Sequence, residues 1–599
     1  MKRISIVIFI VAAMVIVACN NYLDTNTNPN QPTSVTPNLI LPQALAASAQ
    51  VLNRYNTYGA QIGGYSANAG GYGGFNELVS YAYTSNNYND LWPNTYDNLE
   101  DYQYIIDKTT GDAANIYFNA AATIMKVNGF QLLVDAFNDV PYSQALKGDN
   151  SLTPAYDKGA TIYASLAVEL DSAVARINRG QSLATKNPID NYDIVFGGDM
   201  NKWKQLANTI KLRLLIRGQG KVTFANTGFD AAGFLTTDAL INPGYTRDNN
   251  RQNPKWNTWA WAYTGTAGNK AWIPTTWMVS FYDGTNLKDP WRGTASYYKF
   301  GVIDNLGTVT GGVGYQDGIY KKVPLTGGSG TGTADITVTS GVVKSVNVLA
   351  SRGYLAGEVV SADSTKIGGT GKGFLVPVST VVIMSNQLGV ETVNAPKCPE
   401  GSFWFPATQR VGASAGDSTG VLKGPNAGFP LLTAAESHFL QAEAMVAGIV
   451  IPGGGSAASH FDDGIAASFQ YLYQLPDKTY AGNYAADAAT YIADNNSSYL
   501  VNFSLASSAD QKIEAIITQK YIALNYVNSQ EGWNDYRRTG YPIVTGTGAT
   551  RTFASIVSQS TRPDRLPTRI LYPSSEAQYN PANNPGGISP FTSTIFWAK

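Results

Sequence analysis

The residue with the clearest chemistry lies near the start of the chain. Two basic residues precede an apolar run over residues 4–17, which is followed by Ala18 and Cys19. The run is shorter than the roughly 20 residues that span a bilayer, and its length is typical of a secretory signal. An apolar run followed by a small residue and a cysteine is the pattern of a bacterial lipoprotein signal, in which the thiol takes the lipid. We therefore predict a signal peptide over residues 1–18 and lipidation of Cys19.

Aromatic side chains interleaved with amides form a second group with recognisable chemistry. Tyr and Trp rings match the apolar face of a sugar ring, and amide side chains both donate to and accept from sugar hydroxyls. Residues 65–96 and 256–277 have this composition, and residues 403–405 add a shorter aromatic run. The alternative for each of these aromatic residues is that its ring is buried in the hydrophobic core and does not contact a ligand. The candidate ligand contacts are Tyr72, Phe75, Tyr88, Trp92, Trp259, Trp261, Tyr263, Trp272 and Trp404.

The spacing of residues offers little for catalysis or metal binding. The only histidines, His438 and His460, lie outside any HExxH motif, and the chain has no cysteine pair or P-loop. Residues 412–416 match G-x-S-x-G, but loop-like sequence follows where a nucleophile elbow requires a helix. No two carboxylates stand out as a glycosidase pair. We predict a protein that is not an enzyme and has no catalytic residue, metal or cofactor.

The overall charge excludes further classes of partner. Charged residues make up 14% of the 599 residues, below a typical value of about 25%, and the formal net charge is -1. Such a chain has no field that favours nucleic acid or an anionic polymer. Its polar surface must come from uncharged side chains, which suit neutral, hydroxyl-rich ligands.

The elements that would position these side chains are mainly helices. Apolar residues recur at helical spacing in five segments, at 113–137, 162–177, 203–214, 433–448 and 513–524. Long loops rich in Gly and Pro separate them, and loops on a rigid scaffold usually carry function. Residues 20–42 contain four prolines, which predict an extended tether rather than a helix.

One block has a different pattern. Residues 325–382 are rich in Gly, Thr and Val, with apolar residues alternating at Ile336 and Val338 and again at Val346 and Val348. Period-two alternation framed by Gly-rich turns predicts an all-β insert. A long disordered loop is the alternative.

Six stretches, in chain order, resemble motifs of the SusD/RagB family, in particular its second large branch. The most specific contains EGWNDYRRTG at 531–540, and two others read VDAFNDVPYS at 134–143 and AESHFLQAEA at 435–444. Asn138 stands where the family usually has Gly, and Asn also tolerates the left-handed end of a helix. The remaining stretches are residues 22–35, 198–214 and 569–576.

The resemblance implies a mainly α-helical fold, in which tetratricopeptide-like helix pairs support a loop-rich ligand face. It also implies an outer-membrane lipoprotein that faces the cell exterior and has a SusC-like TonB-dependent transporter as its partner. The predicted organisation is a signal peptide at 1–18, a lipid-anchored tether at 19–42, a first helical part at 43–324, the β insert at 325–382, and a second helical part at 383–599.

Charged residues within these motifs are predicted to be structural. Glu436 and Glu443 are seven apart on one helix face, and Arg213 and Arg217 are four apart on another. Carboxylates among Ala and Leu are rarely buried unless they are paired. We expect some of these ions to pair between helices or to cap loop carbonyls. For the arginine pair at 537–538, which follows a tryptophan, the options are a solvated turn, a bidentate pair with a carboxylate or a cation–π stack, and a structural role is favoured.

These observations favour surface capture of an oligosaccharide or a peptide for the partner transporter, without covalent chemistry. A surface glycoside hydrolase is the first alternative. A structural adhesin that uses the β insert is the second.

Overall fold

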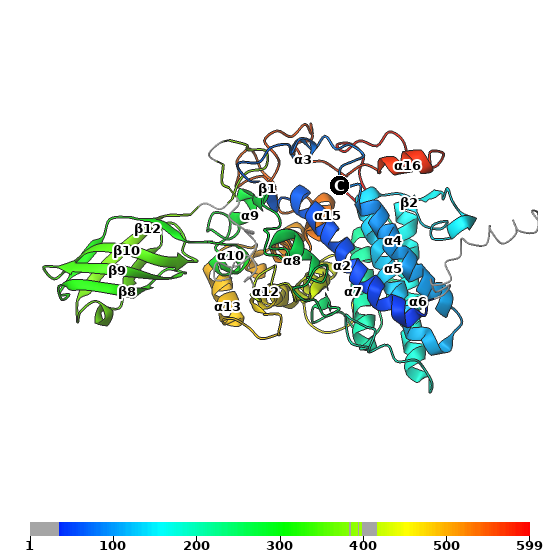
Figure 1. Ribbon diagram of the computed structural model, residues 1–599, viewed down its shortest axis with the longest axis horizontal. Coiled ribbons are helices and arrows are strands. Elements are labelled where there is room, and N and C mark those ends of the chain that lie inside the picture. Colours follow the sequence, from blue (N-terminus) through cyan, green and yellow to red (C-terminus); the bar gives the residue numbers. More distant parts are fainter. Residues whose placement is uncertain (1–34, 383–384, 393–394, 398–415) are drawn as a thin grey trace, which may run out of the picture.

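The computed structural model describes residues 35–382, 385–392, 395–397 and 416–599. Most of this chain is α-helical, as the spacing of apolar residues predicts, and an elongated β insert projects from one end (Figure 1). The long helices are α2 (Pro37–Ile62), α4 (Leu91–Thr109), α5 (Ile116–Phe137), α6 (Gly159–Ser182), α7 (Met200–Gly218), α11 (Ala434–Val446), α12 (Ala457–Tyr473), α13 (Tyr484–Asp494), α14 (Ala509–Ala523) and α15 (Ser529–Thr539).

Helices that follow one another in the chain pack side by side. Helix α4 packs against α5, α5 against α6, and α6 against α7. Helix α7 then contacts α11, which contacts α12 and α14, while α15 packs against α2. Helix α5 lies inside this array and is apolar around most of its circumference. Gly129 of α5 brings it close to α4, because a β-carbon there would lie 2.8 Å from Leu99 Cδ2. The array positions the loops, which lie outside it.

The first helix begins earlier than its prolines suggest. The predicted tether extends to residue 42, but α2 starts at Pro37 and includes Pro42. Proline is favoured at the first helical position, where its missing N–H would have no partner anyway. The buried face that starts at Leu41 compensates for the one hydrogen bond that Pro42 cannot donate.

Short elements join the helices. The short helices are α3 (Glu77–Ser80), α8 (Pro254–Trp259), α9 (Thr276–Val279), α10 (Pro290–Ser296) and α16 (Ser574–Tyr579). Two-stranded antiparallel sheets pair β1 (Ser66–Asn68) with β5 (Trp272–Pro274), β2 (Val140–Pro141) with β3 (Tyr156–Asp157), and β4 (Ala239–Ile241) with β13 (Phe429–Leu432). Among the described residues, no helix is long and apolar enough to cross a bilayer.

The insert is an antiparallel, nearly barrel-shaped sheet of seven strands. In spatial order they are β10 (Val342–Arg352), β9 (Thr331–Thr339), β8 (Gly318–Thr326), β11 (Val359–Ala362), β12 (Lys372–Val381) and β6 (Ile303–Leu306), while β7 (Thr310–Val313) also pairs with β12. The prediction of β structure is confirmed, but the sheet starts before residue 325. Strands β6 and β7 are four residues long, bury only one residue between them and contain Asn or Gly, so their sequences show no alternation.

The insert has a hydrophobic core of its own. Ile336, Val338, Phe374, Val376 and Val378 are buried in it, separately from the helical core. Its two ends lie together, since the backbone N–H of residue 382 donates to the carbonyl of residue 302 at 2.9 Å. The insert is therefore a compact unit that is connected to the helical body by two neighbouring chain segments, one at each end of the insert.

The end of the sheet that faces the helical body is tightly hydrogen-bonded. The backbone of Gly353 donates to Phe300 at 2.9 Å, and that of Tyr354 donates to Gly301 at 3.1 Å. Gly301 has a φ of +65°, and a β-carbon there would lie 2.5 Å from Tyr354 N. Only glycine permits this approach. These bonds fix the loops at the base of the insert against the body.

Candidate ligand-binding site

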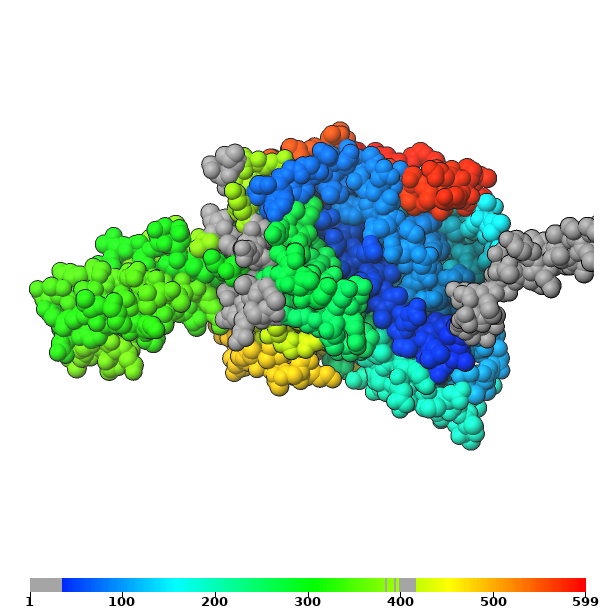
Figure 2. Space-filling view, in the orientation of Figure 1, coloured from blue at the N-terminus to red at the C-terminus, as the bar shows by residue number. Residues whose placement is uncertain are grey.

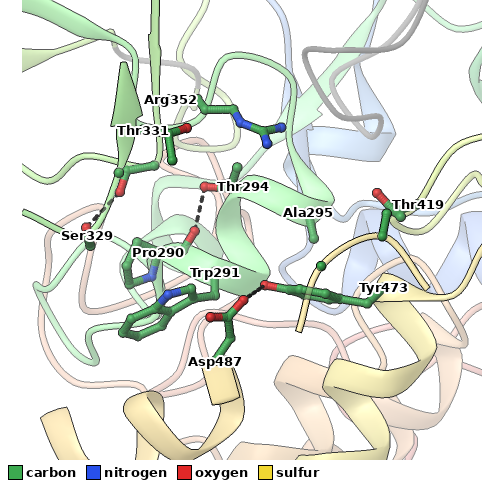
Figure 3. Close-up of a pocket in the computed structure, with 14 residues that line it drawn as sticks. Pro290, Trp291, Thr294, Ala295, Ser329, Thr331, Arg352, Thr419, Tyr473 and Asp487 are labelled. Atoms are coloured by element: carbon green, nitrogen blue, oxygen red, sulfur yellow. Dashed lines mark hydrogen bonds between the residues drawn. The ribbon is translucent and has the colours of Figure 1, made fainter. Parts of the chain in front are cut away.

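A cavity of about 370 Å³ lies where the β insert meets the helical body. Its walls come from α10, from the turns at the base of the insert, and from the segment that joins α12 to α13 (Figure 3). The volume falls within the range of roughly 300–1,000 Å³ that is usual for small-ligand pockets. The polar and aromatic lining side chains are Trp291, Thr294, Ser329, Thr331, Arg352, Thr419, Tyr473 and Asp487.

Trp291 provides the largest aromatic surface of this pocket, and α10 holds it firmly. Asp289 caps the helix by accepting from the backbone N–H of Arg292 at 3.1 Å, and Pro290 occupies the first helical position. The buried Arg292 guanidinium pairs with Asp289 at 2.5 Å and lies 4.6 Å from the ring centroid of Tyr491. A helix anchored in this way presents the half-buried Trp291 at a fixed position.

A hydrogen-bond donor of α12 and an acceptor of α13 are joined in the wall of this pocket. The Tyr473 hydroxyl donates to Asp487 Oδ2 at 2.7 Å (Figure 3). Burial raises the pKa of Tyr473, so its hydroxyl keeps its proton near neutral pH. Because this bond uses one oxygen, the other carboxylate oxygen of Asp487 is left to accept from a ligand hydroxyl.

The insert contributes a cation to the same pocket. Arg352, at the end of β10, has no ion-pair partner among the residues that the structure describes. Its guanidinium points away from the sheet toward the cavity (Figure 3). Five N–H donors in a planar fork are therefore available to ligand oxygens.

This lining suits a neutral ligand that carries several hydroxyl groups. It combines an aromatic surface, an acceptor in Asp487, a donor in Arg352 and the hydroxyl groups of Ser and Thr residues. It does not suit glycosidase chemistry, which needs two carboxylates, because Asp487 is the one carboxylate among the described lining residues.

The structure brings the two predicted aromatic regions together. Strand β1 pairs with β5, and Phe75 lies edge-on to Trp272 with 5.2 Å between the ring centroids. Both rings are buried. Trp92, Trp259 and Trp261 are buried as well, the second with none of its surface exposed. In this fold these five side chains belong to the core, so the contact role predicted for them does not match their burial.

The remaining predicted contacts differ in exposure. Tyr72 and Tyr263 are 40% and 44% exposed, and they stay candidate contacts. Tyr88 is half-buried, and its hydroxyl donates to Gln61 Oε1 at 3.0 Å. Trp404, like Cys19 and residues 412–415 of the G-x-S-x-G phrase, lies outside the described residues.

Sequence reasoning missed the side chains of the cavity. Trp291 follows Asp289 and Pro290, a helix-start signal that gives no reason to expect a ligand. Arg352 lies in the insert, and Tyr473 and Asp487 lie on α12 and α13. No spacing along the chain connects these segments. Packing of α12 against α10 and α13 brings Trp291, Tyr473 and Asp487 together, and the insert adds Arg352.

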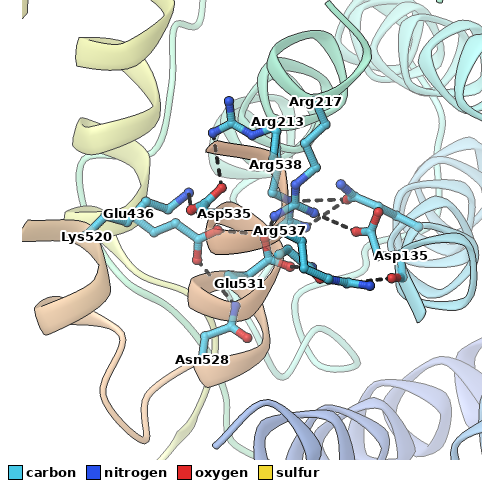
Figure 4. A network of polar contacts seen from close by, with 12 residues as sticks. Asp135, Arg213, Arg217, Glu436, Lys520, Asn528, Glu531, Asp535, Arg537 and Arg538 are labelled. Carbon is cyan, nitrogen blue, oxygen red and sulfur yellow. Dashed lines mark hydrogen bonds and ion pairs between the residues drawn. The ribbon is translucent and has the colours of Figure 1, made fainter. Parts of the chain in front are cut away.

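A separate buried network joins the helices (Figure 4). Arg213 pairs with Glu436 at 3.0 Å, while Arg217 pairs with Asp135 at 2.6 Å and also with Glu531. All five side chains are almost fully buried. The prediction that these charges pair between helices is confirmed.

The arginine pair at 537–538 belongs to the same interior. Arg538 pairs with Glu443 at 2.7 Å. The Arg537 guanidinium lies 5.2 Å from the ring centroid of Trp533 and 4.9 Å from that of Trp597, and it donates to backbone carbonyls. These contacts agree with the predicted structural role.

Two family models match the chain. Residues 29–274 match the model described as starch-binding associating with outer membrane, and residues 423–591 match that of the SusD and RagB outer membrane lipoproteins. Together they span more than half of the chain and leave out the insert. No curated protein matches.

Solved structures share the fold at low sequence identity. A SusD/RagB family protein from Bacteroides thetaiotaomicron is 17% identical with a TM-score of 0.59, over 94% of this chain and 99% of its own. A chitin-binding SusD homolog from Flavobacterium johnsoniae is 20% identical with a TM-score of 0.56, over 93% and 98%. A SusD-like protein from Bacteroidetes is 19% identical with a TM-score of 0.60, over 94% and 100%.

Proposed function

The chain belongs to the SusD/RagB family of nutrient-binding outer-membrane lipoproteins, and we propose that it captures a neutral oligosaccharide at the cell surface. The family is one of binding proteins without catalytic activity. The proposed site is the cavity between the insert and α10, with Trp291, Arg352 and Asp487 as its main contacts.

The observation that carries this proposal is the lining of the cavity. The Trp291 ring would pack on the apolar face of a sugar, while Asp487 accepts from hydroxyls and Arg352 donates to them. A formal net charge of -1 gives no attraction for a strongly anionic polymer. The similar structure from Flavobacterium johnsoniae is that of a chitin-binding homolog, which agrees with a glycan as the ligand class proposed here.

Anchoring and delivery complete the proposal. A lipid on Cys19 would hold the protein in the outer membrane, facing the exterior. The captured ligand would then pass to a SusC-like TonB-dependent transporter, which the family membership implies. The exposed Tyr72 and Tyr263 are proposed as further contacts on the loops of the body.

A peptide is the second candidate ligand, because Arg352 is unpaired within the described residues. A guanidinium in a partly enclosed site would bind a terminal or side-chain carboxylate bidentately. Replacement of Arg352 by Gln distinguishes the two ligands. Peptide binding would then be abolished, whereas binding of a neutral glycan would weaken and persist through the remaining contacts.

The experiment is isothermal titration of the lipoprotein, purified in detergent, against a panel of neutral oligosaccharides and peptides. Mass spectrometry of the same mixtures then reports whether the ligand is cleaved. Saturable binding of an intact oligosaccharide supports the proposal. Cleavage would instead make the protein a surface hydrolase, and binding of peptides alone would exclude the glycan.

A further inference from the structure

The only two histidines of the chain meet on one surface of the helical body. His438 lies on α11 and His460 on the neighbouring α12, and their Nδ1 atoms are 3.4 Å apart. Asp463, one turn further along α12, places Oδ2 4.0 Å from His438 Nδ1. Donor atoms from all three side chains lie within 4.8 Å of one another.

Close packing of the two helices fixes this arrangement. Gly464 of α12 faces Phe439 of α11, and a β-carbon on Gly464 would lie 2.6 Å from the phenyl ring. The helices can therefore approach closely at the residues that directly follow His438 and Asp463. Neither histidine has to change its backbone position for the three donor atoms to converge.

The distances fit a tetrahedral metal ion. Zn²⁺ binds imidazole nitrogen and carboxylate oxygen at roughly 2.0–2.1 Å, which places two ligand atoms of a tetrahedron about 3.3 Å apart. The two nitrogens already have nearly this separation. Asp463 is slightly too far away, but its side chain is 59% exposed and free to turn inward.

We propose that His438, His460 and Asp463 bind one Zn²⁺ ion, with water in the fourth position. Two imidazoles and one carboxylate favour a borderline transition metal over Ca²⁺ or Mg²⁺, which prefer oxygen ligands. The ion joins α11 to α12. Because the three ligands converge only in the folded chain, zinc binding stabilises this helix pair against unfolding.

The zinc site is distinct from the proposed glycan pocket. His460 lies near the start of α12, whereas Tyr473 of the pocket ends that helix. A rise of 1.5 Å per residue puts the two about 20 Å apart along the helix. Zinc binding is therefore expected to leave oligosaccharide affinity unchanged, and the two proposals can fail separately.

The test is titration of ZnCl₂ into the metal-free lipoprotein, purified in detergent without a histidine tag. One equivalent is expected to bind. His460→Gln and Asp463→Asn should each lower the zinc affinity by at least about tenfold. Removing a residue that only hydrogen-bonds to a metal ligand typically costs this much, so removing a ligand itself should cost no less. The matched control is Asp462→Asn, which changes the neighbouring exposed carboxylate and should leave the affinity unchanged.

Two further measurements make the result specific. Co²⁺ in place of Zn²⁺ should give the intense visible absorption of a tetrahedral ion, and the His460→Gln variant should lack it. Cys398→Ser should bind zinc as the unchanged protein does. The proposal is overturned if zinc does not bind or if the His460→Gln and Asp463→Asn variants bind it with unchanged affinity. It is also overturned if the Cys398→Ser variant loses zinc binding.

Discussion

Arg213 of α7 and Glu436 of α11 form a buried ion pair of 3.0 Å, although 223 residues separate them in the sequence. The first lies before the β insert and the second after it. Around this pair, Arg217 and Glu531 extend the network to α15. The two helical parts therefore form one body, and the insert does not interrupt their packing.

Charge reversal at Glu443 should destabilise this body without changing what it binds. Glu443→Lys would place a cation beside Arg538, its present partner at 2.7 Å. Breaking a buried pair in this way typically costs about 3–5 kcal/mol, because one charge is left uncompensated. The expected result is a lower Tm with the same order of ligand preference, as measured by calorimetry and ligand titration. An exposed acid, Glu391→Lys, serves as the control, and an equal Tm for both variants would refute the structural role.

Two buried lysines make stability depend on pH. Burial lowers the pKa of Lys255 to about 7, with a smaller contribution from the charge on Lys423, and burial likewise lowers the pKa of Lys423 to about 7. Lys255 Nζ donates to the carbonyl of Val527 at 3.1 Å, and Lys423 donates to the carbonyls of Tyr471 and Gln474. Both ammonium groups thus donate to backbone carbonyls. Within the described residues, neither forms an ion pair with a carboxylate.

The direction of the effect follows from proton binding. Between pH 7 and about 8.5, below the range in which the tyrosines of the unfolded chain lose their protons, both lysines hold more protons in the unfolded chain than in the folded chain. The free energy of unfolding should therefore rise with pH across this window, by up to about 1.4 kcal/mol per pH unit for each lysine. Urea unfolding at about pH 7.2 and about pH 8.5 measures this rise. Lys255→Met should reduce the slope; an unchanged slope would show that Lys255 stays protonated.

Removal of the insert should abolish oligosaccharide binding but leave the helical body folded. Residues 303–381 have their own core, and the chain enters and leaves them at backbone groups 2.9 Å apart. A short Gly-Ser linker in their place should leave the helical body folded, with cooperative unfolding near the original Tm. Oligosaccharide binding should be lost, because Ser329, Thr331 and Arg352 leave with the insert.

Two other outcomes of the deletion are informative. Retained oligosaccharide affinity would show that the pocket at the insert is not the binding site, and would point to the loop aromatics Tyr72 and Tyr263. Loss of cell attachment with retained oligosaccharide affinity would support the adhesin alternative. Cell-attachment assays and titrations on the same variant distinguish these results.

Sequence patterns predicted the helical scaffold well because its helices bury periodic apolar faces. They also predicted the ion pairs, since carboxylates such as Glu436 and Glu443 among small apolar residues need buried partners. The β insert was recognisable from Ile336 and Val338, which alternate with polar residues. Its first strands were missed because exposed, Gly-containing strands have no such alternation.

The ligand site was less predictable for two physical reasons. Aromatic composition does not distinguish a core ring from a contact ring, and Trp259 is fully buried against Tyr526. In addition, Trp291, Arg352 and Asp487 come from three segments that lie far apart in the sequence and meet only through tertiary packing, and Arg352 joins the other two only where the insert meets the body. The histidine pair was missed for a different reason: His438 and His460 lie on two helices whose packing, and not a metal-motif spacing along the chain, brings them together.

The most direct test of the central claim is the oligosaccharide affinity of the Trp291→Ala variant. Loss of the apolar surface of one large side chain typically costs about 1.5–3 kcal/mol, so the Kd for the best ligand of the panel should rise at least about tenfold. The matched control is Tyr579→Ala, which removes a ring that is 75% exposed on α16, at the far end of the body from the insert (Figures 1 and 2). Weaker binding is expected for the first variant and unchanged binding for the second. Unchanged affinity in both would contradict a glycan site at the junction of the insert and the helical body.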